Sequence, residues 1–452
     1  MAMELDPGSL SAAERAALAR IDAGEVMDFA GAGEAKPAIR AAFLRYLALR
    51  PAPPVCGIRL RHGRITGPLD LAYARLRALV LEDCEIDDPI DLSHARLDAL
   101  CIERSRFSHL LARATVIDGP FDFSDAAPAG STAWIDAAEA RIAGGITGLR
   151  ARLRAPAPRP PAEVKPWDRV YALRLSEAEI GGNLRLADRF IAEGGICLDD
   201  AHLRGSLSMA EGVVITASEG DLLHPGDALH AYAFRCDGMA GLNFGFRSEG
   251  RIFIGFSRFG SRLHIDGVLR GARAGYDFKG RSLNTSAALM VDDCQIGANV
   301  VFTAATSVEG AISFNRSKIG GNLSFAGNDF GNLSRVEVAI RNRGADGQMP
   351  ALSIERAEIA GDLLFGHRFS AEGKVSLTRT RIGGDLDFVQ ARFENRTEDE
   401  TGTAIDARRI AVAGELRPDP AESEVPVATI GGLVNFAGAL IGPETRLDEH
   451  QP

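Results

Sequence analysis

The sequence lacks the features that mark a metal site, a redox enzyme or a membrane protein. Its six cysteines include no CxxC pair, and no Cys/His spacing matches a zinc site. It has no GxGxxG fingerprint and no flavin or metal signature, so we expect neither a cofactor nor a bound metal. No apolar run reaches membrane-spanning length, and the first residues lack the apolar core of a signal peptide. These absences predict a chain that works in a reducing cytoplasm.

Aromatic residues are also scarce, at 6% of the chain, but 22 of them are phenylalanine, and glycine reaches 49 residues. One favoured ring type and abundant glycine are typical of a chain that repeats one tight turn many times. The formal net charge is −10, from 61 acidic and 51 basic residues. This mild acidity argues against duplex DNA as a direct ligand, so we do not expect a nucleic-acid partner.

From residue 58 onward, large hydrophobic residues recur in steps of five within a period of 21 residues. The first two copies of the pattern are Leu71, Leu76, Leu81 and Ile86, then Leu92, Leu97, Ile102 and Phe107. Two residues before these positions, large residues alternate with small ones such as Ala74 and Cys84. Neither a helix nor simple strand alternation has this period, whereas a four-sided coil with small residues at its corners does. One coil cannot bury its own interior, so the coils must stack.

The motif Ile-x-Gly-x-Leu marks successive coils along the chain. Its copies begin at Ile65, Ile117, Ile142, Ile180, Leu203, Ile319, Ile359, Ile382 and Ile430. We interpret its glycine as a source of backbone freedom at a turn. A phenylalanine often lies six residues after the isoleucine, and coils spaced by about 4.8 Å would stack these rings into an internal ladder. The rings concerned are Phe302, Phe325, Phe365, Phe388 and Phe436.

A longer repeat is superposed on the coils. Ala172, Ala228, Ala288 and Ala351 each begin an Ala-Leu or Ala-Ile pair, and a Glu-Gly pair follows after 21 residues. The glutamates of those pairs are Glu193, Glu249, Glu309 and Glu372. We interpret each unit as two coils closed by a loop of variable length.

These patterns predict an all-β protein, a right-handed parallel β-helix with four-sided coils of about 21 residues. We expect a helical N-terminal cap over residues 1–57, a single β-solenoid over 58–442 and a polar tail over 443–452. The cap is predicted to contain helices over 9–22 and 37–48. The predicted inserted loops lie at about 148–169, 215–227, 333–350, 394–403 and 415–428.

The Ala-x-Leu centres spaced by five residues resemble pentapeptide-repeat proteins. The two-coil unit ALSIERAEIAGDLLFGHRFSAEGKVSLTRTRIGGDLDF, with the helical N-terminus, is similar to a bacterial β-solenoid family whose members are often labelled "membrane-associated oxidoreductase". The resemblance covers roughly nine-tenths of the chain and implies the fold. It carries no catalytic motif over to this sequence, and the chain departs from the strict five-residue pattern after residue 110.

Residues that could perform chemistry are present but scattered. Acidic pairs such as Asp87/Asp88, Asp199/Asp200 and Asp292/Asp293 lie next to coil corners, where aspartate favours turn hydrogen bonds. We therefore predict structural roles for them and name no catalytic residue. His224 and His230 share a loop, but no further ligand has the spacing of a metal site. Cys84 and Cys294 occupy small inward positions and are expected to be inert, whereas Cys101 and Cys197 are expected to point outward.

The segment 148–169 is the candidate binding loop, because solenoid insertions often collect on the binding face. It is basic and rich in proline, and it contains one of only two tryptophans. Its candidate binding residues are Arg150, Arg152, Arg154, Arg159, Lys165, Trp167 and Arg169. Such a loop suits an acidic protein, a phospholipid headgroup or RNA, and a solvated linker is the alternative interpretation.

We interpret the chain as a non-enzymatic scaffold or interaction protein that presents loops on a rigid β-solenoid. One alternative is a β-helix enzyme, carbohydrate-active or oxidoreductase, with a groove site of converging carboxylates or histidines. Another is a DNA-mimicking topoisomerase-binding protein, although arginines such as Arg75 and Arg96 interrupt the acidic rows.

The expected partner is a protein or a second copy of the chain, with peripheral contact to the inner membrane as an open alternative. The segment 430–442 is strongly apolar. The end of a solenoid exposes unpaired strands and core side chains, so end-to-end homodimerisation through 430–442 is predicted.

Overall fold

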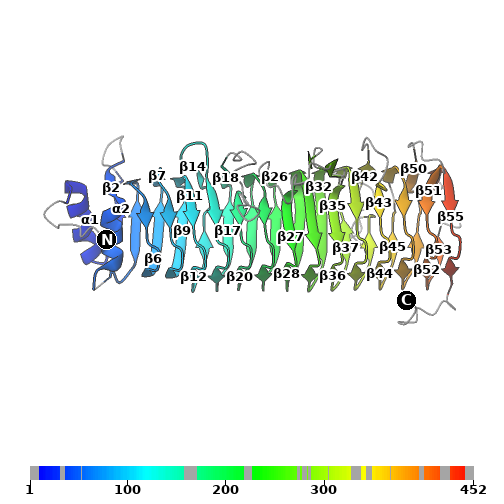
Figure 1. The fold of residues 1–452 in the computed structure, drawn as a ribbon, viewed down its shortest axis with the longest axis horizontal. Helices are drawn as coiled ribbons and strands as arrows, with labels where there is room; N and C mark the ends of the chain where they lie inside the picture. The colour runs from blue at the N-terminus through cyan, green and yellow to red at the C-terminus, as the bar shows by residue number, and fades with distance from the viewer. Residues whose placement is uncertain are drawn as a thin grey trace. The chain divides into compact units, whose positions relative to one another are not determined.

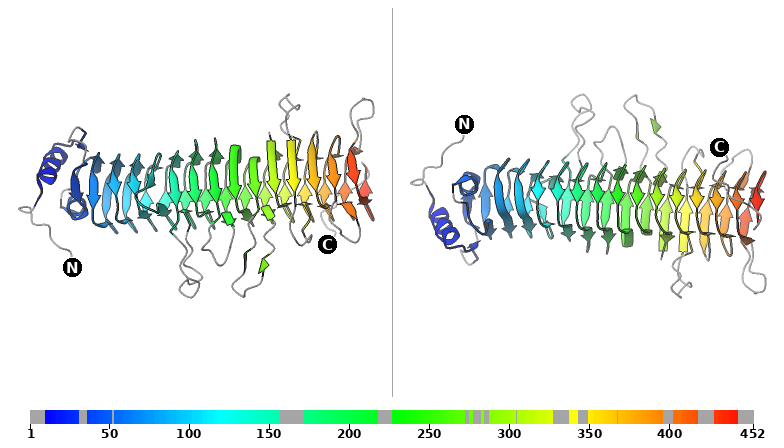
Figure 2. Two further views of the ribbon diagram at one scale, coloured as in Figure 1. Left: turned by 90° about the horizontal axis from the view of Figure 1, so that it is seen from above. Right: turned by 90° about the horizontal axis from the view of Figure 1, so that it is seen from below.

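The residues that recur every 21 positions are buried and in register. Strand β6 (Arg75–Glu82) pairs in parallel with β9 (Arg96–Glu103), from Arg75 opposite Arg96 to Glu82 opposite Glu103. Leu76 and Leu97 face each other in this ladder and are 6% and 0% exposed. Short parallel strands stacked coil on coil make the fold a parallel β-helix, as predicted, and the stacking is visible in two orientations (Figures 1 and 2).

The structure is a computed structural model, and internal contacts divide the chain into two compact units, residues 1–206 and residues 207–452. The residues that the structure describes are 10–30, 36–51, 53–156, 171–217, 227–271, 275–276, 282–283, 287–303, 305–326, 337–342, 349–366, 368–395, 402–417 and 428–442.

The N-terminal cap contains two helices, α1 (Ala12–Asp22) and α2 (Ala41–Leu49). Ser11 caps α1 in the predicted capping box, since its side chain accepts from the Glu14 backbone N–H and Glu14 accepts from the Ser11 N–H. The second helix begins later than predicted. Residues 38–40 form β2 (Ala38–Arg40), which pairs in parallel with β4 (Arg64–Thr66), so Pro37 precedes a strand.

Helix α2 closes the first coil of the first unit. Its residues Phe43, Leu44 and Leu47 are fully buried, and the helix contacts β3 (Ile58–Arg61), β5 (Leu69–Asp70) and β6. The apolar face of α2 thereby removes core side chains and strand edges of this coil from water. Neither helix is long enough and apolar enough to cross a membrane, and no other helix occurs in the described part of the chain.

The glycine of the Ile-x-Gly-x-Leu motif has the predicted positive φ in two copies, Gly67 (83°) and Gly432 (145°). In other copies its role differs from the predicted one, since Gly182, Gly321 and Gly384 are absent from the residues with positive φ. A Cβ at these three positions would lie 2.7, 2.0 and 2.0 Å from the nearest atom of the preceding coil. Glycine is required because the coils approach each other so closely at this corner.

Asparagine and aspartate follow this glycine and join one coil to the next. In the second unit, Asn299 Oδ1 accepts from the Asn322 N–H at 2.9 Å, and Asn322 Oδ1 accepts from the Asp362 N–H at 2.9 Å. Asp362 and Asp385 continue the ladder with carboxylate oxygens at 2.8 Å from the next backbone N–H. The ladder satisfies donors at a corner that would otherwise be left without a partner.

Phenylalanines fill the interior of the second unit. The rings of Phe302, Phe325, Phe365 and Phe388 stack in order, with centroid distances of 4.6, 5.5 and 5.4 Å. This confirms the predicted ladder for these four rings, whereas Phe436 lies in the last described coil and is only partly buried. The Glu-Gly pairs also form corners, because Gly250, Gly310 and Gly373 have φ of 129°, 127° and 119°.

Three of the predicted inserted loops contain strands, so their bounds need correction. One is 415–428, where β53 (Leu416–Arg417) pairs with β49 (Leu386–Asp387). The other two are 148–169 and 333–350. Strand β18 (Arg152–Arg154) lies within 148–169, and β42 (Glu337–Arg341) lies within 333–350. Both strands belong to the coil stack, since β18 pairs with β22 (Ile191–Glu193) and β42 pairs with β46 (Phe369–Glu372). Charged residues at their outward positions hid these strands from the hydrophobic pattern.

Candidate interaction surfaces and a buried polar column

The predicted binding loop is divided by the structure. Arg150, Arg152 and Arg154 lie in or beside the strands of the first unit, whereas Arg159, Lys165, Trp167 and Arg169 fall outside the described residues. Arg152 Nη2 lies 2.6 Å from Glu193 Oε1, and Arg154 pairs with the other oxygen of the same carboxylate. Burial alone would raise the pKa of Glu193, but hydrogen bonds from these two arginines lower it below its usual value.

Arg150 forms part of a corner ladder of alternating charge. Its guanidinium donates to Asp125 at 2.7 and 2.8 Å and to Asp188 at 2.5 Å. The two carboxylates raise the pKa of the Arg150 guanidinium, the bond to Asp125 contributing most. Three of the seven predicted binding residues are therefore matched by carboxylates of their own unit. Their role in binding a partner stays a prediction.

The acidic pairs hold turns and neighbouring coils, in keeping with their predicted structural roles. Asp87 pairs with Arg64 at 2.7 Å, and Asp88 accepts from the Gly67 N–H at 3.0 Å. In the second unit, Asp292 accepts from the Asn315 N–H at 2.8 Å, and Asp293 pairs with Arg316 at 2.5 Å. In each of these two pairs the two carboxylates bind different groups, because the side chains of neighbouring residues point in different directions.

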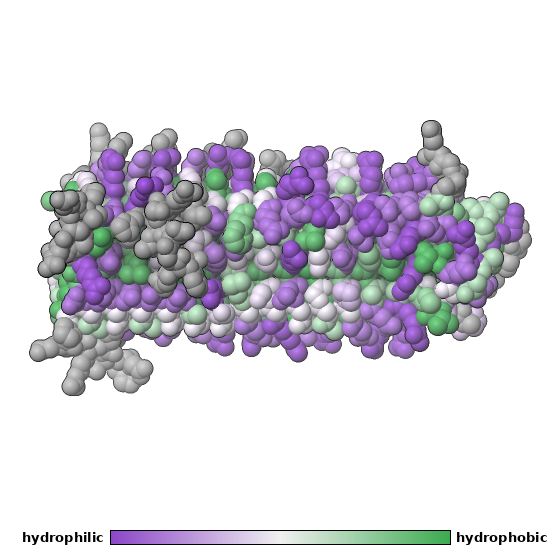
Figure 3. All heavy atoms as spheres, turned by 180° about the vertical axis from the view of Figure 1, so that it is seen from behind, coloured by the Kyte–Doolittle hydropathy of each residue, from purple (hydrophilic) through white to green (hydrophobic). Residues whose placement is uncertain are grey.

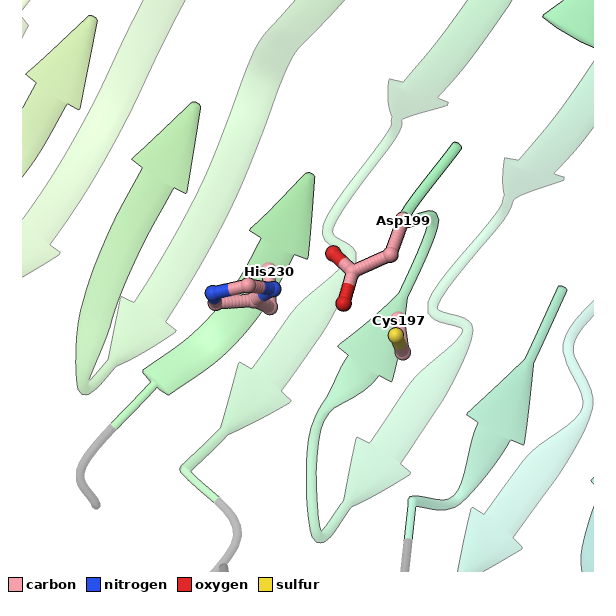
Figure 4. Close-up of side chains that lie close together, drawn as sticks. All are labelled: Cys197, Asp199 and His230. Carbon is pink, nitrogen blue, oxygen red and sulfur yellow. The ribbon is translucent and has the colours of Figure 1, made fainter. Parts of the chain in front are cut away.

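The cysteine thiols of the coils are poor nucleophiles. Cys84 and Cys294 are 0% and 1% exposed, as predicted, and burial raises their pKa to about 11 and about 12. Cys197 occupies an outward register position on β23 (Ile196–Cys197), opposite Arg174, and is nevertheless 1% exposed. Burial raises its pKa to about 12, and Figure 4 shows it beside the turn that holds Asp199. A thiol with a raised pKa carries little thiolate at neutral pH and reacts slowly.

His230 belongs to a packed cluster in the second unit, and its predicted companion His224 lies outside the described residues. It is 1% exposed on β27 (Asp227–Tyr232), and its ring (Figure 4) stacks on Phe253 with centroids 4.9 Å apart. Arg251 donates two hydrogen bonds to Asp227, at 2.5 and 3.1 Å, and also lies over the Phe253 ring. The cluster joins two coils through a charge pair and stacked rings.

Three polar residues form one column on the outer face of the second unit. Asn243 lies in β29 (Ala240–Glu249), Asp266 in β32 (Leu263–Arg270), and Thr303 directly after β37 (Val300–Phe302). Each follows an inward residue in register, because Leu242 pairs with Ile265 and Ile265 pairs with Phe302. The three polar side chains are 7%, 8% and 8% exposed, respectively. We call them the polar column.

The electrostatics of the polar column are unusual for an outer face. Asp266 Oδ2 accepts one backbone bond, from the Phe244 N–H at 3.3 Å, while burial raises the pKa of its carboxyl. His264 is hydrogen-bonded to the Thr303 hydroxyl, and burial lowers the pKa of its imidazole. Asn243 Oδ1 is buried and has no hydrogen-bond partner in the described structure. Burial therefore shifts the pKa values of the Asp266 carboxyl and the His264 imidazole toward each other.

Replacing Asp266 by asparagine is expected to stabilise the protein at neutral pH. The folded pKa of Asp266 lies above the unfolded value, so folded protein binds more protons and loses stability as pH rises through that interval. Asp266→Asn removes the buried charge and should increase the free energy of unfolding by about 1 kcal/mol at pH 7, and by less at pH 4. Thermal melts at both pH values measure this.

The matched control is Asp98→Asn, at an exposed position in the first unit. It should leave the melting temperature unchanged at both pH values. A gain for Asp266→Asn that is equal at pH 7 and pH 4, or a loss at pH 7, would contradict the assignment of a costly buried carboxylate.

Hydrophilic side chains predominate on the face drawn in Figure 3, and hydrophobic ones lie in narrow bands between them. Against this background, residues 429–442 are exceptional, and we call them the C-terminal coil. Five of the twelve exposed large hydrophobic residues of the described chain lie in it. They are Ile430 (39% exposed), Leu433 (64%), Val434 (39%), Leu440 (61%) and Ile441 (41%). Exposed hydrophobic patches of this kind mark interaction sites.

The strands of the C-terminal coil have a partner on one side only among the described residues. Strand β54 (Thr429–Gly431) pairs with β50 (Arg392–Glu394), β55 (Leu433–Asn435) with β51 (Thr403–Asp406), and β56 (Leu440–Ile441) with β52 (Ala411–Val412). Backbone donors and acceptors on the other side are open to a further strand, which is the usual template for association.

No protein-family model matches the chain, and no curated protein and no solved structure is significantly similar to it.

Proposed function

We propose that the chain is a non-enzymatic interaction protein whose C-terminal coil binds the C-terminal coil of a second copy. The observation that carries the proposal is the set of five exposed hydrophobic side chains on strands that are paired on one side. A second coil laid on this one would bury those side chains and offer strand edges to the open backbone groups.

A second copy is the best occupant because the coil carries no charge. Residues 429–442 read TIGGLVNFAGALIG and contain no acidic or basic side chain. Two identical faces can therefore meet without like-charge repulsion, which a two-fold, self-complementary interface requires. Head-to-tail stacking onto the first coil is disfavoured, because α2 already covers that coil.

The energy available is sufficient for a stable dimer. Burying the exposed part of five large hydrophobic side chains is worth on the order of 5 kcal/mol per copy. Backbone hydrogen bonds along three strands would fix the orientation of the two copies but add little binding free energy, because each new hydrogen bond replaces one to water.

We also propose that the protein is cytoplasmic and belongs with the pentapeptide-repeat-like β-solenoids that it resembles. The basic segment 148–169 is proposed as a second contact, for an acidic protein or the inner membrane surface. Support for it comes from the sequence and from the exposure of Arg150, Arg152 and Arg154, whose side chains are 42%, 51% and 45% exposed although each pairs with a carboxylate.

Substituting Leu433 and Leu440 by aspartate should abolish the dimer. The two carboxylates would stand on the contact face and would face the same charges in the second copy, so burial would become unfavourable. Light scattering after size exclusion in about 1 M NaCl, which screens charge pairs between copies, should give twice the 48.1 kDa chain mass for the wild type and the chain mass for Leu433→Asp/Leu440→Asp. The control Phe256→Asp, at a 59% exposed residue elsewhere in the second unit, should leave the dimer intact.

Circular dichroism establishes that the double variant is folded. A chain shortened to end at residue 442 separates coil pairing from exchange of the last ten residues. If the shortened chain remains dimeric, coil pairing is supported. If it becomes monomeric, or if Leu433→Asp/Leu440→Asp still dimerises in about 1 M NaCl, the proposed contact is wrong.

A further inference from the structure

One corner of each coil holds a residue with a left-handed backbone, and the side chains there form ladders of like charge. In the first unit, three successive coils place Glu139, Glu177 and Asp200 at this corner, with φ of 60°, 58° and 54°. In the second unit, three successive coils place Arg356, Arg379 and Arg409 there, with φ of 56°, 59° and 57°. We call these two sets the acidic ladder and the basic ladder.

Backbone hydrogen bonds establish the register of both ladders. The Glu139 N–H donates to Ser176 O, and the Glu177 N–H donates to Asp199 O, so each acid lies over the next. The Arg356 N–H donates to Thr378 O, and the Arg379 N–H donates to Arg408 O, which gives the same offset. Successive charges in both ladders are therefore about 4.8 Å apart along the coil stack.

The backbone does not demand charged residues at this corner. A left-handed conformation favours glycine, asparagine or aspartate, and it gives arginine and glutamate no advantage. Other coils have Tyr73, His94 and Ala114 at the same corner, again with positive φ. Three like charges in a row repel one another, so a structural role does not account for either ladder.

Both ladders are exposed and have no ion pair of their own. All six side chains are exposed, and none of them makes an ion pair within the residues that the structure describes. Three acids near the basic ladder are matched by other bases: Asp293 pairs with Arg316, Glu358 with Lys318, and Asp406 with Lys374 and Arg408. Glu355, next to Arg356, accepts a hydrogen bond from the Ser376 hydroxyl at 2.6 Å. The charges of the basic ladder are thus available to a partner.

We infer that the basic ladder of one copy binds the acidic ladder of another, so that copies associate side by side. The two ladders match in number, sign, backbone conformation and spacing, and three charge pairs can therefore form at once. Charge complementarity within the chain itself points to a second copy and not to an unrelated polyanion. This contact uses different residues from the C-terminal coil, and it does not depend on the proposed function.

Charge reversal tests the inference. One variant carries Arg356→Glu, Arg379→Glu and Arg409→Glu, a second carries Glu139→Lys, Glu177→Lys and Asp200→Lys, and a third carries all six substitutions. The control carries Arg75→Glu, Arg77→Glu and Arg141→Glu, three exposed arginines outside the ladders. Every chain also carries Leu433→Asp and Leu440→Asp, which remove the C-terminal coil contact. A parallel series without these two substitutions shows whether they themselves cause misfolding.

Sedimentation velocity should show association for the unreversed chain, for the control and for the six-fold variant. This association should weaken at least about tenfold between about 50 mM and about 500 mM NaCl, because exposed charge pairs are screened. Each three-fold ladder variant alone should remain dissociated, and an equimolar mixture of the two should associate. Failure of that mixture to associate, or association that is insensitive to salt, would overturn the inference. The inference would also be overturned if the unreversed chain did not self-associate but bound heparin through the basic ladder, because the partner would then be a polyanion.

Discussion

Phe365→Ala should destabilise the protein by about 3–5 kcal/mol, because it removes a buried ring from the centre of a stack. Phe365 is 0% exposed and stacks on Phe325 at 5.5 Å and on Phe388 at 5.4 Å. Phe369 and Phe393 also contact it edge-on, at 4.9 and 5.3 Å. Neighbouring coils are fixed by their backbone ladders, so the cavity cannot collapse and its full cost remains.

Urea unfolding followed by circular dichroism measures this effect. The control is Phe256→Ala, where the ring is 59% exposed and contacts the Tyr232 ring, so a loss below about 1 kcal/mol is expected. Equal losses for the two variants would mean that the phenylalanine ladder does not stabilise the second unit as described.

Gly267→Ala is the second substitution with a large expected effect. Gly267 has φ of 132°, a conformation that is essentially restricted to glycine. A Cβ there would lie 1.9 Å from the carbonyl oxygen of Phe246 on the adjacent strand. The substitution should cost about 3 kcal/mol or more, because strained backbone and a backbone clash add together.

Gly130→Ala provides the matched control. Gly130 has no positive φ, and nothing lies within 4 Å of the position that a Cβ would take. This variant should unfold like the wild type or slightly later, since alanine restricts the unfolded chain. If Gly267→Ala is as stable as Gly130→Ala, the backbone at Gly267 can move to accommodate a Cβ with no loss in the free energy of unfolding, and the prediction is wrong.

The sequence predicted the coil interior well because its repeat is strict. A residue that recurs every 21 positions must stack on its own copy, so Leu76 over Leu97 followed directly from the spacing. Phe325 over Phe365 followed from the place of each ring six residues after the motif isoleucine. The Glu-Gly pairs indicated the positions of coil corners for the same reason, because a corner that repeats needs the same backbone conformation each time.

The sequence did not predict contacts between residues of different coils that lie outside the repeat. Arg150 and Arg154 read as free basic residues, yet Asp125, Asp188 and Glu193 neutralise them from other coils. The motif glycines were all assigned to turn freedom, because the close approach of another coil at Gly182, Gly321 and Gly384 leaves no mark in the chain itself.

The polar column and the two charged ladders were missed for a related reason. Their members lie one coil apart, and inserted segments of different length separate them in the chain. A positive-φ corner also tolerates many residue types, so a charge there does not stand out until the coils are stacked. Aligning the sequence coil by coil, with the insertions removed, would have brought Arg356, Arg379 and Arg409 into one row.

The most direct test of the central claim is the molecular mass of the full chain in about 1 M NaCl, where charge pairs between copies are screened and hydrophobic contacts persist. Sedimentation equilibrium at micromolar concentration should then give twice the 48.1 kDa chain mass, because the C-terminal coil is uncharged and its contact is hydrophobic. A single-chain mass throughout the concentration range would contradict the account, since the exposed coil would then have no partner in a second copy.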